Sequence, residues 1–181
     1  MESTNQKGRE PVDSAHGKQD SFVAYAAKWM EEFGARIPDR SLLEEVGQGF
    51  YDSLIIHGVS VDLAEPGRVV CTMRVFPALC NSGKRMHGGA ITSLVDTLGS
   101  AAIFSTGLPY SGVSVDINVT FMAAAELGEE IEIESKALRV GKSLAFVTVD
   151  IRKKATGKLV AQGRHTKFIG PSAPKIRNSK L

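Results

Sequence analysis

The sequence predicts an α+β fold in which a single antiparallel β-sheet wraps around one long central helix. Residues 90–106 carry apolar side chains at the three-to-four spacing of a helix, and so many positions are apolar that most sides of this helix should be buried. The segments before and after it alternate between apolar and polar residues and are separated by short turns, as antiparallel strands are. Two strands, one helix and four strands is the order of one sheet around one helix.

Six strands follow from the alternation and from the residues between the segments. Residues 64–67 predict a tight turn, because Pro66 and Gly67 suit its geometry. In residues 113–121 the odd-numbered positions are apolar and the even-numbered ones polar, so we expect Ser114 on the polar face of its strand. The predicted strands are residues 54–63 and 68–76 before the helix, and 113–121, 129–140, 143–153 and 159–169 after it.

The segments outside the sheet and helix are assigned from composition and periodicity. An apolar stripe from Phe22 to Phe33 predicts a helix, and its polar face is not basic, so we expect it to dock on the domain rather than lie on a membrane. The capping-box spacing of Ser41 and Glu44 predicts a second, short helix. We assign residues 1–19 as disordered, 20–50 as a helical extension, 54–169 as the main domain and 170–181 as a flexible tail.

Composition argues against several classes of function. The formal net charge is +2 and is not concentrated on one basic face, so we expect no nucleic-acid partner. No apolar run approaches the ~20 residues that a membrane span needs. Cys71 and Cys80 have no second pair with which to form a zinc site, so we expect free thiols and no metal. His16, His57 and His165 lack companions at catalytic spacing and are interpreted as structural or surface residues.

The last three residues indicate a cellular address. Ser179, Lys180 and Leu181 form a carboxy-terminal Ser-Lys-Leu, which the peroxisomal import receptor reads. An address must be accessible, and the Pro- and Gly-containing stretch at residues 170–174 predicts a flexible connection. We therefore expect the protein in the peroxisome.

The central helix begins at a sequence suited to binding an anion. His87, Gly88 and Gly89 lead into it, and the first amides of a helix lack intrahelical acceptors and lie at the positive end of its dipole. Glycine lets a ligand approach the backbone closely. Further along, Asp96 has small and mostly hydroxylic neighbours one turn away. A carboxylate there needs a partner, a ligand or a wet cavity.

These residues resemble the hot-dog fold, and more closely the small, PaaI-like acyl-CoA thioesterases of the thioesterase-superfamily-member-2 type. The resemblance covers residues 54–169 and lies in an ordered series of motifs rather than in one of them. The matching segments are Asn81 with His87-Gly88-Gly89, Leu94-Val95-Asp96, and residues 112–118, 127–129, 141–146, 155–158 and 161–167.

The resemblance implies a role for each matched residue. The amide of Gly88 polarises the thioester oxygen with help from Asn81, and His87 orients the acyl and thiol portions. Asp96 acts as base or nucleophile, and Ser114 orients water or the carboxylate. The implied contacts to substrate and coenzyme A are Gly89, Phe121, Met122, Arg139, Gly141, Lys142 and Ser143.

Helical geometry argues that the site is shared between two chains. Asp96 lies nine residues beyond His87, which is about half a turn out of phase and roughly 13 Å along the helix. Asp96 cannot easily serve the oxyanion pocket at the start of its own helix, whereas an antiparallel second copy would bring its own Asp96 there. We expect a homodimer, assembled further into a dimer of dimers, as in the family.

The predicted function is hydrolysis of medium- to long-chain fatty acyl-CoA to free acid and coenzyme A, without a metal or other cofactor. One alternative is an aromatic-CoA thioesterase acting on a dihydroxynaphthoyl-type substrate, although such relatives tend to carry Glu in place of Asp96. A second is a 3-hydroxyacyl-CoA dehydratase or hydratase, and a third is a dimeric acyl-CoA binder without catalytic activity. Release of thiol from acyl-CoA distinguishes the first reading from the last two.

Overall fold

A computed structural model of the chain describes residues 24–32, 45–110 and 112–171. Residue contacts divide the chain into two units, residues 1–48 and 49–181. In the first unit, residues 24–32 are helical, as the apolar stripe predicts. All of these residues are exposed, and Lys28 pairs with Glu32 one turn on at 3.8 Å. The expected starts and ends of the two extension helices, and the tail from residue 172, lie outside the described residues.

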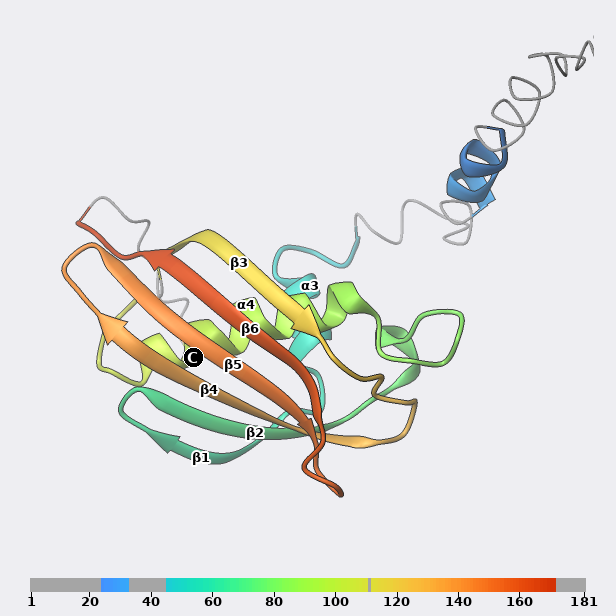
Figure 1. Ribbon diagram of the computed structural model, residues 1–181. Coiled ribbons are helices and arrows are strands. Elements are labelled where there is room, and N and C mark those ends of the chain that lie inside the picture. The colour runs from blue at the N-terminus through green and yellow to red at the C-terminus, as the bar shows by residue number, and fades with distance from the viewer. Residues whose placement is uncertain (1–23, 33–44, 111, 172–181) are drawn as a thin grey trace, which may run out of the picture. The chain divides into compact units, whose positions relative to one another are not determined.

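The second unit consists of one sheet, one long helix and a short helix (Figure 1). Its order is a short helix, two strands, the long helix and four strands, with a 3-10 turn (Pro77–Leu79) before the long helix. The bounds are α3 Phe50–Ile56, β1 Ser60–Glu65, β2 Arg68–Arg74, α4 Gly88–Phe104, β3 Val113–Phe121, β4 Glu130–Val140, β5 Leu144–Lys153 and β6 Leu159–Phe168.

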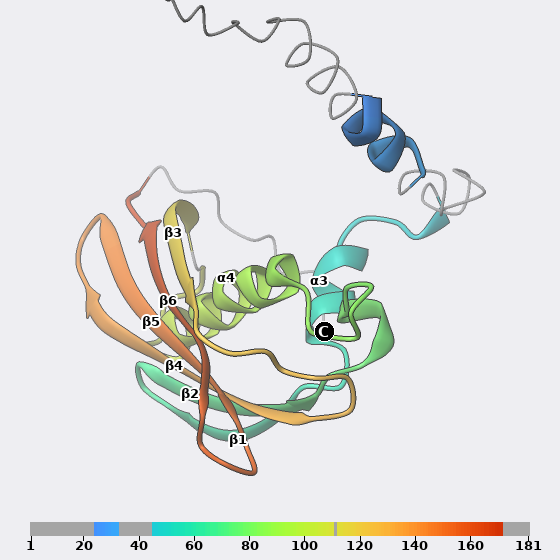
Figure 2. The ribbon, with the colours of Figure 1, turned by 45° about the vertical axis from the view of Figure 1, so that its right-hand side comes forward.

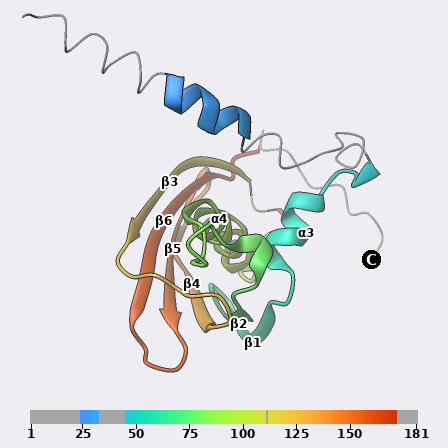
Figure 3. The same cartoon turned by 90° about the vertical axis from the view of Figure 1, so that its right-hand side faces the viewer.

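The sheet is antiparallel throughout, with strand order β1-β2-β4-β5-β6-β3. It curves around α4, and α3 covers α4 on the side that the sheet leaves open (Figures 2 and 3). β3 follows α4 in the chain but pairs with β6, so β1 and β3 form the two edges. This placement brings the start of β3 beside the middle of α4.

Helix α4 is the core of the unit. Leu94, Val95 and Ile103 are fully buried among apolar side chains of the sheet. The close approach of helix and sheet depends on Gly163 of β6, where an added Cβ would lie only 2.5 Å from a methyl carbon of Val95. Burial of the helix on most sides is thus confirmed, and it rests on small residues in the facing strand as well as on the apolar helix.

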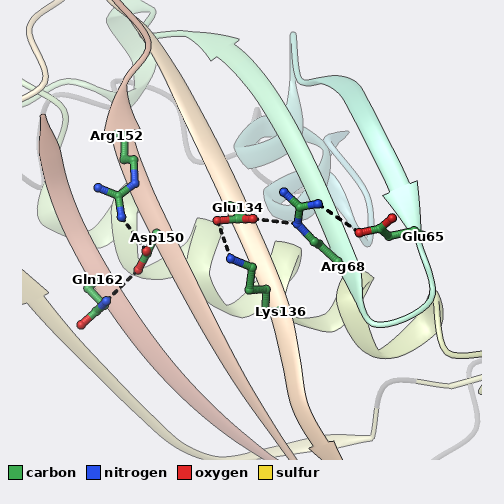
Figure 4. Close-up of polar contacts among 7 residues, drawn as sticks. All are labelled: Glu65, Arg68, Glu134, Lys136, Asp150, Arg152 and Gln162. Atoms are coloured by element: carbon green, nitrogen blue, oxygen red, sulfur yellow. Dashed lines mark hydrogen bonds and ion pairs between the residues drawn. The ribbon is translucent and has the colours of Figure 1, made fainter. Parts of the chain in front are cut away.

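The outer face of the sheet carries charged pairs instead (Figure 4). Glu134 of β4 accepts from Arg68 of β2 at 2.7 Å and pairs with Lys136 at 2.8 Å, and Lys136 is the main reason that the pKa of Glu134 lies below its usual value. On β5, Asp150 accepts from Arg152 and from Gln162 of β6, both at 2.8 Å. Such exposed pairs contribute about 0–1 kcal/mol each, so stability lies on the inner face.

The prediction of a strand over residues 54–63 was wrong in its first half. Phe50–Ile56 forms α3, which packs on α4, and β1 begins only at Ser60. Gly58, at φ 74°, reverses the chain between them in a conformation that favours glycine. The run Leu54-Ile-Ile56 is too short for its periodicity to distinguish a strand from one turn of buried helix.

Ser114 does not lie on the face that alternation predicts. The pairing of β3 with β6 joins Ser114 to Lys167 and Asp116 to Thr166, which leaves Val115 as an extra residue in a bulge. The bulge moves Ser114 to the helix side of the sheet, while Val115 is 61% exposed. The alternation of apolar and polar residues predicts the face of the sheet on which a side chain lies only where the strand has no bulge.

No helix in the described parts of the chain is long and apolar enough to cross a bilayer. Within the same residues, no group of three or more His, Cys, Asp and Glu side chains is arranged to hold a metal ion. Cys71 is buried and Cys80 half-buried, and both are free thiols. Burial raises the pKa of both thiols, which keeps them protonated at neutral pH.

Candidate active site

Asp96 is held from below by a chain of hydrogen bonds that begins in the sheet. The Ser114 hydroxyl donates to Asp96 Oδ1 at 3.0 Å, and His165 Nε2 lies 3.0 Å from the same hydroxyl oxygen. Since the hydroxyl proton goes to Asp96, the His165 ring must donate its Nε2 proton to Ser114. The carboxylate itself is 45% exposed, so its other oxygen is open to a ligand.

The buried position of His165 keeps its ring neutral. Its side chain is fully buried, and its pKa is lowered to about 4, mainly by burial and then by the positive charge of Lys167. Asp96, Asp116 and the Val95 backbone raise the pKa of His165, but by less than burial and Lys167 lower it. Among the described residues, none forms a hydrogen bond with Nδ1 of the ring. A neutral ring with its proton on Nε2 is the form that the Ser114 contact requires.

Lys167 is the second buried polar residue beneath Asp96. It is 4% exposed, and its Nζ donates to Ser100 Oγ at 2.6 Å and lies 3.7 Å from Asp96 Oδ1. Burial lowers the pKa of Lys167, and the Asp96 carboxylate opposes that shift. Ser100 in turn donates to the Asp96 carbonyl at 2.9 Å. Lys167 therefore reaches both the side chain and the backbone of Asp96.

The amino end of α4 forms a separate polar group. His87 caps the helix, because its Nδ1 accepts the Gly89 amide at 2.9 Å. This bond fixes the tautomer of a neutral ring and leaves Nε2–H as a donor. Gly88 is the first helical residue, and an added Cβ there would lie 3.6 Å from the Phe121 ring. The predicted residues His87, Gly88, Gly89 and Phe121 therefore lie together.

Asn81 stabilises the loop that precedes the helix. Its Oδ1 accepts the backbone amides of Gly83 at 2.9 Å and Arg85 at 3.2 Å. These bonds occupy the side-chain oxygen and orient the amide, so Nδ2 is the group left to donate to a ligand. This orientation matches the donor role that the resemblance implies for Asn81.

The two groups do not meet within one chain. Asp96 lies eight residues beyond Gly88 on α4, or about 12 Å along the helix, and the two groups contact opposite ends of β3. Ser114 lies near the beginning of β3 and Phe121 at its end. A single protomer therefore carries a carboxylate group at one place and an anion-binding helix end at another.

The residues predicted to contact coenzyme A are also divided. Arg139, Gly141, Lys142 and Ser143 line a hollow of about 310 Å³ at the β4–β5 turn. Ser143 bonds to Ile169 beside the start of β3, whereas Phe121 and Met122 lie at the other end of that strand, about 27 Å away. Phe121 and Met122 are about half exposed.

An apolar hollow adjoins the amino end of α4. It has a volume of about 370 Å³ and opens between α3 and the loop before α4. Tyr51 of α3 reaches across to Ser93 of α4, with 2.6 Å between the two hydroxyl oxygens. The lining residues are Tyr51, Leu54, Ile55, Ala78, Leu79, Cys80, His87, Gly89 and Ala90.

Comparison with known proteins places these features in a family. A profile of the thioesterase superfamily matches residues 83–160. Human acyl-coenzyme A thioesterase 13 is 45% identical over 116 residues, which are 64% of this chain and 83% of the human protein. Zebrafish thioesterase superfamily member 2 is 46% identical, with a TM-score of 0.65 over 68% of this chain and 88% of the fish protein. The chain belongs to the thioesterase superfamily.

Membership of the thioesterase superfamily confirms the expected hot-dog fold and the expectation of a thioester hydrolase. The mouse thioesterase superfamily member 2 structure agrees, at 41% identity and a TM-score of 0.63 over 68% of this chain and 90% of the mouse protein. The PaaI protein of E. coli, at 23% identity and a TM-score of 0.57, shares the fold.

Two residues of this thioesterase-superfamily site were missed from the sequence. His165 was interpreted as structural or surface, and Lys167 was not singled out, yet both lie directly beneath Asp96. A signal was present, because in residues 159–169 the inward positions of the alternation read Ala161, Gly163, His165 and Lys167. Ionisable residues at inward positions of a strand indicate a buried polar site.

Proposed function

We propose that the protein is an acyl-CoA thioesterase that hydrolyses medium- to long-chain fatty acyl-CoA to the free acid and coenzyme A. The observation that carries this proposal is the geometry of Asp96, an accessible carboxylate whose Oδ1 is held by Ser114, which in turn contacts the buried His165. Human acyl-coenzyme A thioesterase 13, a relative at 45% identity, has acyl-CoA thioesterase activity in its name, and the preference for medium to long chains is our proposal.

The arrangement around Asp96 favours general-base rather than nucleophilic catalysis. Ser114, His165 and Lys167 all approach Oδ1, which leaves Oδ2 to accept a proton from water. The water oxygen bonds to the thioester carbon while its proton passes to Oδ2. The carbon–sulfur bond of the tetrahedral intermediate then breaks, the leaving sulfur of coenzyme A takes the proton from Oδ2, and the acid is released with the Asp96 carboxylate restored.

The amino end of α4 supplies the complementary half of this reaction. The Gly88 amide and the Asn81 side-chain amide are donors for the oxyanion, and the helix dipole adds positive potential there. His87, with Nδ1 occupied by Gly89, offers its Nε2–H to the sulfur side of the thioester. The two amide donors, Gly88 N–H and Asn81 Nδ2, carry no ionisable group.

A shared site in a homodimer joins the two halves. β3 lies at the sheet edge, and among the described strands it pairs with β6 alone, so a second copy can continue the sheet there. An antiparallel α4 beside the first would bring the Asp96 of one protomer to the Gly88 of the other. The same arrangement would combine Phe121 and Met122 of one protomer with the β4–β5 turn of the other along one coenzyme A. Association of such dimers into a tetramer stays a prediction of the resemblance.

The acyl chain is proposed to enter the apolar hollow beside His87 and Gly89. The hollow adjoins the expected oxyanion pocket, and α3 supplies Tyr51, Leu54 and Ile55 to its wall. The hollow has a volume of about 370 Å³ and a mainly apolar wall, which suit a hydrophobic acyl group. No metal or organic cofactor has a step in this mechanism.

A substrate panel with thiol detection tests the proposal. Acyl-CoA esters of increasing chain length, an aromatic acyl-CoA and an enoyl-CoA are assayed with the wild type and with Asp96→Asn, which keeps the side-chain size and the Ser114 contact. We expect thiol release from the fatty substrates and a loss of about 10²- to 10⁴-fold in Asp96→Asn.

Every other result of the panel contradicts the proposal, and each result indicates either a particular alternative function or a site without Asp96 in the chemistry. Preference for the aromatic substrate indicates the aromatic-CoA thioesterase. Consumption of enoyl-CoA without thiol release indicates the hydratase, and tight binding without turnover indicates an acyl-CoA binder. Equal thiol release by the wild type and Asp96→Asn removes Asp96 from the chemistry.

A further inference from the structure

Lys167 is a buried cation whose position stability alone does not explain. Its side chain is 6% exposed, and lysine is almost never this buried unless it is paired. Replacing buried ionic groups with apolar residues is often neutral or stabilising, so retention of the charge calls for another role. Beyond His165, the inward positions on β6 are filled by Ala161 and Gly163, small residues that pack on α4.

The fold directs Lys167 at one target. On the sheet it lies between Ser114 of β3 and Ala145 of β5, and the small Ala145 leaves room for a long side chain to turn toward the helix. Its Nζ then lies 3.7 Å from Asp96 Oδ1 and 2.6 Å from Ser100 Oγ. The lysine thus approaches the carboxylate from inside the protein, opposite its exposed side.

Two contacts from Lys167 converge on Asp96. The direct one is electrostatic, between the ammonium group and Oδ1. The indirect one runs through Ser100, whose hydroxyl accepts a hydrogen bond from Lys167 and donates one to the Asp96 carbonyl at 2.9 Å. The direct contact restrains the rotation of the carboxylate, and the indirect one restrains the helix backbone that carries it.

The same charge acts on the other support of Asp96. The positive charge of Lys167 disfavours a second positive charge on His165, whose ring is adjacent on β6. A neutral His165 with one proton, on Nε2, donates to Ser114 and so leaves the Ser114 proton for Asp96. Lys167 therefore acts on Oδ1 in two ways: through its own contact, and by favouring the form of His165 that leaves the Ser114 proton for Asp96.

We propose that Lys167 is a positioning residue for hydrolysis, which holds the Asp96 carboxylate directly and through Ser100 so that Oδ2 faces the attacking water. Lys167 lies beneath Asp96 and is covered from the substrate side, so it acts through Asp96 and does not touch substrate. This inference rests on the proposed function and adds to it the residue that orients the base.

The test is Lys167→Met, which keeps the length and shape of the side chain and removes the charge. We expect kcat to fall about ten- to a hundredfold, as for a misplaced catalytic group, with KM within about twofold of the wild type. The matched control is Lys136→Met, which removes an outward-facing lysine paired with Glu134 and should keep the wild-type kcat. The folded state of each variant is checked by circular dichroism and thermal unfolding.

Ser100→Ala separates positioning from a structural role and serves if Lys167→Met does not fold. It leaves the lysine in place and breaks the link to the Asp96 carbonyl, so kcat should fall with KM unchanged. In the double variant the two losses should be less than multiplicative, because both act through Asp96.

The outcomes are distinct. A folded Lys167→Met enzyme with wild-type kcat overturns the inference, as does wild-type kcat in Ser100→Ala when Lys167→Met does not fold. A rise in KM with unchanged kcat also overturns it, because it would place the lysine in substrate binding. A wild type without turnover contradicts the proposed function, and this inference falls with it.

Discussion

At the scale of single residues, the site depends on polar groups that the fold removes from water. Asp96 remains 45% exposed, whereas His165 and Lys167 beneath it are almost completely buried. Burial lowers the pKa of both groups, which keeps His165 neutral, whereas the Asp96 carboxylate opposes the shift of Lys167 and favours its charged form. Asp96 is thereby supported from inside by groups that cannot reorient freely.

The low pKa of His165 predicts that stability falls in mild acid. With a folded-state pKa of about 4 against 6.5 in the unfolded chain, the unfolded state binds more protons between these values. The free energy of unfolding should therefore fall as pH drops from 6.5 to 4, by up to about 1.4 kcal/mol per pH unit. Urea unfolding at pH 7 and pH 5 measures this change.

A variant pair assigns that dependence to one histidine. His165→Gln should weaken the fall in stability between pH 7 and pH 5, since the titrating ring is gone. His57→Gln keeps His165 and should keep the dependence of the wild type. The same slope in His165→Gln as in the wild type would show that other groups cause it.

At the scale of elements, the sequence was sufficient where one pattern governs a whole segment. Helix α4 and strands β2 to β6 appear within a few residues of their predicted bounds, because their alternation or helical spacing is long. The end of α3, residues 54–56, was predicted to begin a strand, because three apolar residues are too few to distinguish the period of a strand from that of a helix. The bulge at Val115 was not predictable, because it is set by the pairing of β3 with β6 and leaves no residue signature in β3 alone.

The site, too, could be predicted from the sequence only in part. The resemblance alone predicts Asp96, Ser114, His87 and Gly88 as functional residues. It assigned Ser114 a role while alternation put it on the wrong face, and the structure reconciles the two through the bulge. His165 and Lys167 are distant in sequence from Asp96, so their contact with it depends on the curvature of the sheet around α4.

The contact between α4 and β6 gives a prediction about packing. An alanine at Gly163 would place its Cβ 2.5 Å from a branched and therefore stiff Val95 side chain. Gly163→Ala should lower the free energy of unfolding by about 1–3 kcal/mol, the usual range for overpacking. Urea unfolding of the variant measures the loss.

A compensating substitution checks that cause. Val95→Ala in the Gly163→Ala background removes both crowding methyl groups, so the double variant should lose less stability than the sum of the two single losses. Additive losses would indicate that Gly163 matters through backbone conformation rather than through its distance to Val95.

At the scale of the whole molecule, the proposed mechanism gives the amino end and the middle of α4 different chemical roles. The amino end would donate hydrogen bonds to the oxyanion and Asp96 would accept a proton from water, and about 12 Å of helix separates them. Catalysis by one protomer would leave each half without the other. Oligomerisation is therefore proposed as a requirement of the mechanism and not only of stability.

Peroxisomal import is a prediction from the sequence at this scale. Residues 179–181 lie outside the described residues, and the prediction rests on Ser179-Lys180-Leu181 alone. A fluorescent protein fused ahead of residues 1–181 should colocalise with a peroxisomal marker, and removal of Leu181 should make it diffuse. Peroxisomal signal in both fusions would show that another segment carries the address.

The shared site has its most direct test in mixed dimers of two inactive variants. Asp96→Asn removes the base, and Asn81→Asp keeps the loop bonds of Oδ1 while removing the amide donor. In a dimer with one copy of each, one site combines both defects and the other is wild type. Random mixing should therefore restore about a quarter of the wild-type thiol release, because half of the dimers are mixed and each has one intact site. Thiol release that stays at the level of the separate variants after subunit exchange would contradict a site shared between protomers.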